Sequence, residues 1–181
     1  VDYFAASVKE NGRRIPNWRE RLGCPGCGLI NRCRAVIHII EKILSPSAES
    51  KIFIAEQTTP VYQWLSKRYP HTVGSEFLGR AIPLGSKRPD GIRNEDLTAL
   101  TFPDGSFDCV MTNDVFEHIP DYQKAFNECQ RVLKPGGVML FTAPFNSNSR
   151  QTVIRARHNS DGTVEHLAPP EYHGDPLNRF K

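Results

Sequence analysis

The chain has 181 residues, of which 39% are hydrophobic and 24% charged, and its formal net charge is +3. This length allows one domain with a substantial core, and the composition is typical of a globular protein and not of a disordered one. The basic residues cluster at Lys9–Arg21 and Arg150–Arg157 without an aromatic stacking platform, which favours a solvated face over nucleic-acid binding.

The apolar runs and the cysteines bear on the cellular compartment in which the chain is expected. The longest apolar run, Val36–Ile40, is interrupted by His38 and is too short to span a bilayer, and no secretory signal is visible. Two of the five cysteines, Cys109 and Cys129, lie in segments that are expected to be buried. Disulfides are therefore not expected, and a reducing cytoplasm fits best. Because the chain starts at Val1 and not at a methionine, we expect a trimmed N-terminus.

Residues 1–30 are polar and contain the only CxxC pair, Cys24 and Cys27. Two such thiolates form half of a zinc-ribbon knuckle, and a closed site needs two more ligands. The nearest candidates, Cys33 and His38, lie on different faces of a predicted helix. The pattern favours no metal, and the alternative is a second pair of ligands upstream of this chain.

The first half of the α/β region is predicted from helical spacing and capping residues. Asn31 is expected to cap the first helix, and Thr58 or Thr59 to cap the second, with Pro60 at its first position. The predicted elements are, in chain order, a helix from Asn31 to Ser45, a strand at Lys51–Ala55, a helix from Pro60, a strand at His71–Glu76 and a short strand near Gly91–Arg93.

The second half contains the clearest pattern. Phe107–Thr112 and Val138–Ala143 are continuous apolar strands, and between them Pro120 opens an amphipathic helix that Pro135-Gly136-Gly137 ends. Strands that alternate with helices predict parallel β-α-β units with right-handed crossovers. After Asn146 the chain is polar and rich in proline and histidine, and we expect no helix or strand there.

The segment DGSFDCVMTNDVFEHIPDYQKAFNECQRVLKPGGVMLFTAPF (104–145) resembles class I S-adenosylmethionine-dependent methyltransferases. The similarity extends more loosely over residues 31–175, and FIAEQTTPVYQWL resembles a subgroup whose first loop is poor in glycine. The resemblance implies an α/β Rossmann-like three-layer sandwich with a mainly parallel sheet in the order 3-2-1-4-5. It also implies a final β-hairpin, which we do not expect to find because no pattern after Phe145 indicates it.

The resemblance further implies that S-adenosylmethionine crosses the carboxyl ends of the strands. Glu56 would contact its amino-acid end, and Glu76 would hold the ribose hydroxyls, since a carboxylate accepts two hydrogen bonds at once. Asp96, with Leu97 beside it, would contact the adenine. Two residues after the fourth strand would line the same crevice: Asn113 and Asp114.

The first loop departs from a glycine-rich pattern. Threonine resists positive φ and Pro60 lacks an N–H donor, so close backbone approach to a cofactor is harder than in a glycine loop. The threonine hydroxyls can replace part of the lost hydrogen bonding, so Gln57 and Thr58 are candidate cofactor-binding residues. If their side chains instead fill the crevice, the domain has kept the fold and lost the cofactor.

The leading hypothesis is therefore an enzyme that transfers a methyl group to an oxygen or nitrogen nucleophile of a small molecule or a glycan precursor. His118 or His173 would act as general base, because the histidine pKa lies near neutrality. Packing under the site is the structural alternative for His118. The alternative function is a catalytically silent methyltransferase-like module for binding or scaffolding.

The chain is expected to divide into a polar segment (1–30), a methyltransferase-like domain (31–145) and a loop segment (146–181). Residues 146–175, with Tyr172 and His173, are expected to form a lid or a wall of the acceptor site, and the natural protein to continue past Lys181. The alternative for this tail is a frayed end. Exposed sheet edges favour a homo-oligomer, and no nucleic-acid or membrane partner is expected.

Overall fold

The computed structural model describes residues 8–10, 13–15, 22–144, 150–159 and 163–169. In chain order these form β1 (Val8–Glu10), β2 (Arg13–Ile15), α1 (Asn31–Ile39), the π-helix η1 (Ile40–Leu44), β3 (Ile52–Ile54), α2 (Pro60–Arg68), β4 (Thr72–Gly74), β5 (Phe107–Asn113), the 3-10 helix η2 (Phe116–His118), α3 (Tyr122–Val132), β6 (Leu133–Thr142), β7 (Ala156–His158) and β8 (Val164–His166).

The main sheet has four strands in the order β4-β3-β5-β6, and all neighbours are parallel. In the expected order 3-2-1-4-5, these four strands correspond to strands 2, 1, 4 and 5. The predicted third strand is reduced to one parallel bridge, Glu76 with Asn94, at the position where that strand would continue the sheet. The fold class is therefore confirmed: a Rossmann-like sandwich with a mainly parallel sheet.

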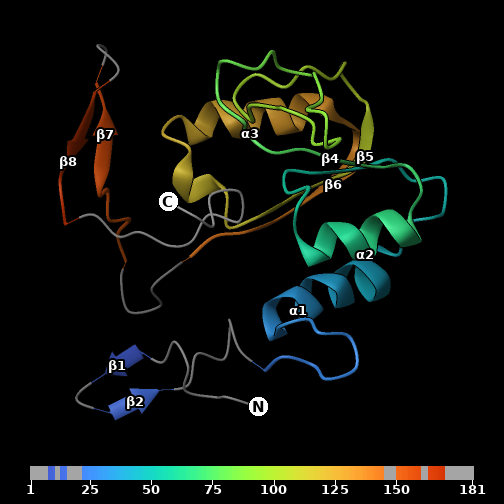
Figure 1. The fold of residues 1–181 in the computed structure, drawn as a ribbon, viewed down its shortest axis with the longest axis horizontal. Coiled ribbons are helices and arrows are strands. Elements are labelled where there is room, and N and C mark those ends of the chain that lie inside the picture. Colours follow the sequence, from blue (N-terminus) through green and yellow to red (C-terminus); the bar gives the residue numbers. More distant parts are fainter. Residues whose placement is uncertain (1–7, 11–12, 16–21, 145–149, 160–162, 170–181) are drawn as a thin grey trace.

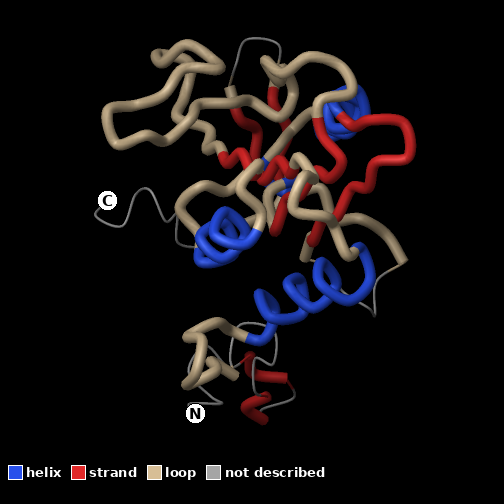
Figure 2. The backbone as a smooth tube through the Cα atoms, turned by 90° about the vertical axis from the view of Figure 1, so that its right-hand side faces the viewer, coloured by secondary structure: helices blue, strands red, loops and turns tan. Residues whose placement is uncertain are grey.

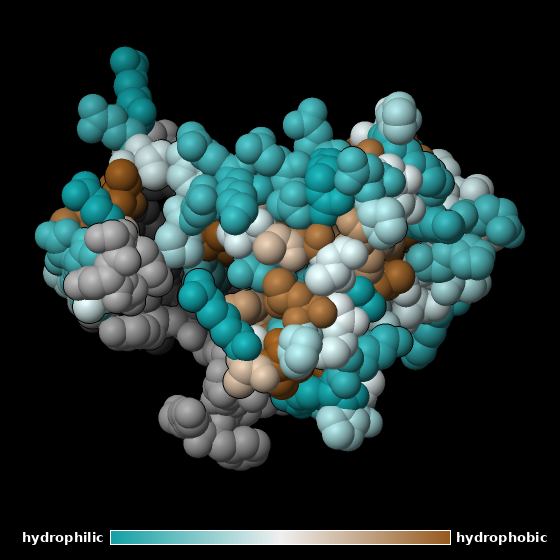
Figure 3. Space-filling model, turned by 90° about the horizontal axis from the view of Figure 1, so that it is seen from above, coloured by the Kyte–Doolittle hydropathy of each residue, from teal (hydrophilic) through white to brown (hydrophobic). Residues whose placement is uncertain are grey.

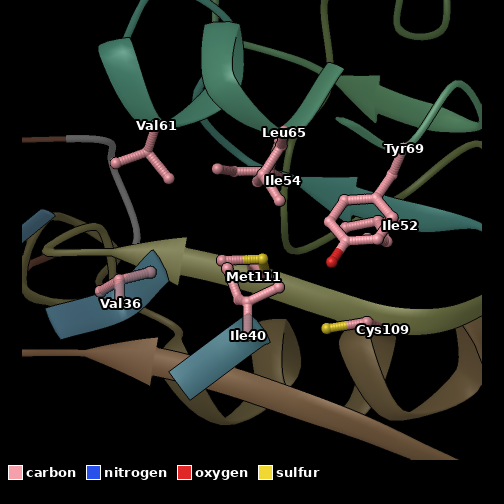
Figure 4. Close-up of a cluster of buried hydrophobic side chains, with 9 residues drawn as sticks. All are labelled: Val36, Ile40, Ile52, Ile54, Val61, Leu65, Tyr69, Cys109 and Met111. Carbon is pink, nitrogen blue, oxygen red and sulfur yellow. The ribbon is translucent and has the colours of Figure 1, made fainter. Parts of the chain in front are cut away.

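Helices cover both faces of the sheet (Figure 1). On one face, apolar residues of α1, η1 and α2 pack against alternate residues of β3 and β5 (Figure 4): Val36, Ile40, Ile52, Ile54, Val61, Leu65, Tyr69, Cys109 and Met111. On the other face, Phe53 and Val110 pack with Ala125, Cys129 and Val132 of α3. Both faces of β3 and β5 are thus buried, which is why these strands are continuously apolar.

The predicted helix caps have two outcomes. Thr59 caps α2 as expected, because its Oγ1 accepts a hydrogen bond of 3.2 Å from the Tyr62 amide. The expectation for Asn31 was wrong: Asn31 is the first helical residue of α1 and Ile30 occupies the cap position without a side-chain bond. Asn31 Oδ1 instead accepts a 3.2 Å hydrogen bond from Arg34 Nη2, so its side chain is used within the first turn.

The expectation of no strand after Asn146 was also wrong. β7 and β8 form an antiparallel hairpin that pairs Ala156 with His166 and His158 with Val164. It is a separate two-stranded sheet, so within the described residues the main sheet ends at β6. The hairpin escaped prediction because β8 is exposed along its whole length, and backbone pairing without a buried face leaves no hydrophobic period in the sequence.

The turn between α3 and β6 confirms that the helix stops before Pro135-Gly136-Gly137, although β6 already begins at Leu133. The register shifts between Phe107 and Cys109 of β5. Gly136 has φ +79°, a conformation that favours glycine. This irregularity allows β6 to follow α3 directly at Leu133 and to pair continuously with β5 from Val138 onward.

The β1–β2 hairpin lies beyond the start of α1 and apart from the main sheet in both ribbon views (Figures 1 and 2). Hydrophilic side chains dominate the face shown in Figure 3, with smaller groups of hydrophobic residues between them. Among the described helices, none combines the length and apolar character that a membrane crossing needs.

Candidate functional site

The carboxyl ends of the parallel strands bring several polar residues together. Glu56 lies in the loop after β3, Glu76 follows β4, and Asn113 is the last residue of β5, with Asp114 directly after it. Because β4, β3 and β5 are adjacent and parallel, these residues meet at one edge of the sheet. Ligands of open α/β sheets bind at this edge.

A pocket of about 240 Å³ opens between this edge and the start of α1. Its walls combine the segment before α1, the first turns of α1, the first loop and the end of β5. The lining residues are Gly28, Leu29, Ile30, Arg32, Cys33, Val36, Glu56, Thr59, Pro60, Val61 and Asn113.

Glu56 is fixed in this pocket by the neighbouring strand. Its Oε1 accepts a hydrogen bond of 2.8 Å from the backbone amide of Asn113. Burial raises the pKa of Glu56 to about 7, although Asn113 and the charge of Arg32 act in the opposite direction. The carboxyl group is therefore poised between its protonated and ionised forms at neutral pH.

The side chain of Asn113 is the unusual feature of the pocket. Asn113 is only 7% exposed, and in the described part of the chain neither Oδ1 nor Nδ2 makes a hydrogen bond of good geometry, although the amide lies near enough to Glu56 to lower the pKa of its carboxyl group. An unpaired buried amide costs about 1–3 kcal/mol, so native proteins rarely keep one without a reason. A polar ligand in the pocket would supply the missing partner.

Arg32 supplies the cation of the pocket and is paired with Asp114. Arg32 Nη1 lies 3.3 Å from Asp114 Oδ2, and the two side chains are 22% and 13% exposed. Asp114 Oδ1 accepts a 2.8 Å hydrogen bond from Thr142 Oγ1 of β6. No task was assigned to Arg32 from the sequence.

Glu76 and the first loop bind each other. Glu76 Oε1 accepts hydrogen bonds from the Gln57 amide (2.8 Å), the Thr58 amide (2.9 Å) and Thr58 Oγ1 (2.9 Å). This carboxylate oxygen thus replaces a cofactor group as partner of the loop amides. All three of these hydrogen bonds fall on Oε1 and none on Oε2.

The Gln57 side chain connects the loop to the segment that follows β4. Its Nε2 donates to Gly91 O at 3.0 Å, and its Oε1 accepts from the Arg93 amide at 2.8 Å. Gln57 therefore spans part of the edge where the crevice was expected. The pocket beside Glu56 is not lined by Gln57, Thr58 or Glu76.

The two candidate adenine contacts differ in their surroundings. Asp96 Oδ1 accepts from Thr98 N (2.8 Å) and Thr98 Oγ1 (2.7 Å), which closes a local turn. Leu97 is 7% exposed and packs in the core with Phe53 and Val110. Asp96 is partly accessible, and both of these hydrogen bonds use Oδ1, whereas most of Leu97 is buried in the core.

The remaining candidates lie in three places. The His118 side chain is 52% exposed in η2, with Nε2 at 4.0 Å from Glu117 Oε1, so it does not pack under the site. His173 lies outside the described residues. Cys24 and Cys27 form a tight turn in which backbone amides lower the pKa of the Cys24 thiol. No group of three or more metal-ligating residues occurs in the part of the chain that the structure describes.

The parallel sheet and its covering helices define a Rossmann-like fold, with a polar pocket at the carboxyl edge where ligands of this fold bind. A family model described as "Methyltransferase domain" matches residues 60–141. Over these residues the chain is similar to the class I S-adenosylmethionine-dependent methyltransferases.

Two curated relatives agree with this family. Demethylmenaquinone methyltransferase of Thermus thermophilus is 34% identical over 124 residues, which are 64% of this chain and 54% of the relative. Malonyl-[acyl-carrier protein] O-methyltransferase 1 of Coxiella burnetii is 34% identical over 91 residues, which are 49% of this chain and 31% of the relative. The chain thus spans about half or less of the length of these relatives. Among solved structures, the YcgJ protein of Bacillus subtilis aligns with a TM-score of 0.48 and 20% identity, over 60% of this chain and 50% of that one.

The pocket residues fit the amino-acid end of S-adenosylmethionine. A carboxylate, a guanidinium and an unpaired amide, from Glu56, Arg32 and Asn113, offer partners for an ammonium and a carboxylate on one carbon. A volume of about 240 Å³ lies below the roughly 300–1,000 Å³ typical of sites that enclose a whole drug-sized ligand. The pocket therefore suits this end of the cofactor and not the entire molecule.

Proposed function

We propose that this chain binds S-adenosylmethionine and transfers its methyl group to an oxygen or nitrogen nucleophile of a small molecule or a glycan precursor. The observation that carries the proposal is the buried Asn113 amide, which makes no hydrogen bond of good geometry in the described part of the chain and lines the same pocket as Glu56 and Arg32. In the absence of a polar ligand this arrangement only destabilises the fold.

Each residue of the site has a proposed task. Glu56 accepts from the ammonium group of the cofactor, Arg32 donates to its carboxylate, and Asn113 bonds to either group. Glu76 binds the ribose through its second oxygen, and Asp96 contacts the adenine. Gln57 and Thr58 position Glu76 through the hydrogen bonds that they make with it or with its neighbours.

When bound, S-adenosylmethionine supplies a methyl group on a sulfonium. The tasks of the protein are then to align the acceptor with that methyl group, to exclude water and to take a proton from the acceptor. His118 is the candidate base, because it lies shortly after β5 and half of its surface is accessible to an acceptor. His173 remains a second candidate from the sequence.

The role of His118 is tested by His118→Gln. A positioned general base contributes about 10²–10⁴-fold to rate, so kcat should fall by at least about a hundredfold. The affinity for S-adenosylhomocysteine should not change, since His118 does not line the pocket. Steady-state kinetics with an accepted substrate and calorimetry with S-adenosylhomocysteine measure the two quantities. An unchanged kcat would assign the base elsewhere.

The test of the whole proposal is calorimetry of the chain with S-adenosylmethionine and S-adenosylhomocysteine. We expect binding of both, with one site per chain. No heat of binding at millimolar ligand would refute the proposed function.

The methyl acceptor is proposed from its chemistry alone. The two relatives named above are called after different acceptors, a demethylmenaquinone and a malonyl-[acyl-carrier protein]. We therefore keep the broader class of oxygen and nitrogen nucleophiles. Mass spectrometry of candidate acceptors after incubation with methyl-labelled cofactor would identify the acceptor.

The second candidate function is a silent methyltransferase-like module. It is favoured by the first loop, in which three donors of Gln57 and Thr58 already satisfy Glu76 Oε1 and the Gln57 side chain bridges to Gly91 and Arg93. Gln57→Ala discriminates between the two functions. If Gln57 occludes the site, the substitution creates or strengthens binding of S-adenosylhomocysteine. If the site is functional, the substitution weakens binding by loosening the loop.

Assembly and domain division stay predictions. Within the described residues the outer edge of β6 pairs with no strand, and Val138 and Phe141 are 40% and 46% exposed. Such an edge favours pairing with another copy of the chain, which light scattering would reveal. The lid proposed for residues 146–175 includes Tyr172 and His173, which lie outside the described residues.

A further inference from the structure

We infer that Asp114 is a positioning residue that holds Arg32 ready for the carboxylate of the cofactor and does not contact the cofactor itself. This inference rests on the proposed function. It differs from the role that the resemblance gave to Asp114, which was to line the cofactor crevice.

The backbone of Asp114 is fixed in an unusual conformation. Its φ is +54°, in the left-handed region, where residues other than glycine are uncommon. The Asp114 amide donates to Thr142 O at 3.0 Å and to Thr142 Oγ1 at 3.1 Å. β6 therefore holds the residue in place directly after the end of β5, beside the pocket residue Asn113.

The two carboxylate oxygens of Asp114 point to different partners. Oδ1 accepts from Thr142 Oγ1 at 2.8 Å, and Oδ2 lies 3.3 Å from Arg32 Nη1. The carboxylate thus links β6 to the first turn of α1. With its side chain 13% exposed, it is shielded from water more than a surface ion pair.

A long side chain such as Arg32 needs such a partner. A free arginine loses rotamer entropy when it is fixed on a ligand, and a partner that fixes it beforehand reduces this cost of binding. The pocket also contains Glu56, and Arg32 contributes to the electrostatics of that carboxyl group. An arginine released by Asp114 can turn toward Glu56 and neutralise the group that the ammonium of the cofactor requires.

The experiment uses Asp114→Asn. Asparagine tolerates the left-handed region and keeps an oxygen for Thr142, but the NH2 group that then faces Arg32 cannot accept a hydrogen bond from it. The single variant Arg32→Gln and the double variant with both substitutions complete a double-mutant cycle. Asp108→Asn is the matched control, because Asp108 lies at the opposite end of β5 and pairs with Lys134 at 2.8 Å.

Two ligands separate the amino-acid end from the rest of the cofactor. S-adenosylhomocysteine carries both parts, and 5′-methylthioadenosine lacks the amino-acid end. Calorimetry should show that Asp114→Asn weakens S-adenosylhomocysteine binding about tenfold, the effect expected for a charge-assisted contact. The affinity for 5′-methylthioadenosine should be unchanged, and Asp108→Asn should change neither affinity.

The double variant tests whether Asp114 acts through Arg32. If it does, Arg32→Gln with Asp114→Asn binds S-adenosylhomocysteine no more weakly than Arg32→Gln alone. An unchanged affinity of Asp114→Asn for S-adenosylhomocysteine overturns the inference, and so do equal losses for both ligands or additive effects in the cycle. If the unaltered chain does not bind S-adenosylhomocysteine, both the proposed function and this inference are refuted. If it binds and Asp114→Asn binds equally well, the inference fails alone.

Discussion

Glu56 connects ionisation, stability and binding at the scale of a single residue. Burial raises its pKa from 4.5 to about 7, against the effects of Asn113 and Arg32, while the charge of Glu76 adds to the rise. Between these two pH values the folded protein binds more protons than the unfolded chain does. The free energy of unfolding therefore decreases as the pH rises through this window.

The variant Glu56→Gln tests this linkage. A shift of this size corresponds to about 3 kcal/mol of unfolding free energy, lost between pH 4.5 and 7 in the parent chain and retained in the variant. Urea unfolding of both proteins at several pH values measures the difference. A parent chain that does not lose stability relative to Glu56→Gln over this range would contradict the raised pKa.

Asn113 should show opposite effects on stability and on binding. Asn113→Leu removes two unpaired buried polar atoms, so the unfolding free energy should rise by about 1–3 kcal/mol. The same change removes a ligand partner, so the affinity for S-adenosylhomocysteine should fall. Chemical denaturation and calorimetry measure the two effects. A loss of stability together with unchanged affinity would mean that Asn113 serves packing and not binding.

At the scale of elements, the first loop depends on close packing against the end of β4. A Cβ atom added at Gly74 would lie 2.5 Å from Tyr62 Cε2 and 2.9 Å from Gln57 Cγ. The absence of a side chain at Gly74 therefore lets α2 and the first loop approach the sheet.

The substitution Gly74→Ala should push Tyr62 and Gln57 outward. We expect a loss of about 1–3 kcal/mol in unfolding free energy, as for other overpacked sites, and weaker cofactor binding. Gly23→Ala is the control, since nothing lies within 4 Å of a Cβ at that position. Equal stabilities of the two variants in urea would show that the loop adapts without strain.

At the scale of the whole molecule, cofactor binding and folding are coupled. The pocket joins α1, the first loop and the end of β5, so a ligand there stabilises three separate parts of the fold. At a hundredfold excess over Kd, S-adenosylhomocysteine should stabilise the folded state by about 2.7 kcal/mol. For a chain of this length this raises Tm by about 5–10 °C. Differential scanning calorimetry with and without ligand measures the shift, and an identical Tm would exclude binding to the folded chain.

The local pattern of the sequence determined most of the elements and the fold class. The apolar runs around Ile52–Ile54 and Phe107–Asn113, the stripe of α3 and the threonine cap of α2 reflect interactions within a few residues of each other. Such interactions leave a periodic pattern that can be recognised before folding. The same locality explains why the methyltransferase resemblance was clearest between residues 104 and 145, where strand, helix, turn and strand follow without interruption.

Only the tertiary structure decided how the polar residues are partnered. Glu56 and Asn113 are 57 positions apart and share a hydrogen bond, and Glu76 binds the loop 18 and 19 positions before it. Arg32 and Asp114 meet because α1 packs beside the end of β5. The exposed β7–β8 hairpin was likewise missed. A hydrogen bond between distant segments imposes no spacing on either segment, so the sequence named the candidate carboxylates and the fold determined which of them line the pocket.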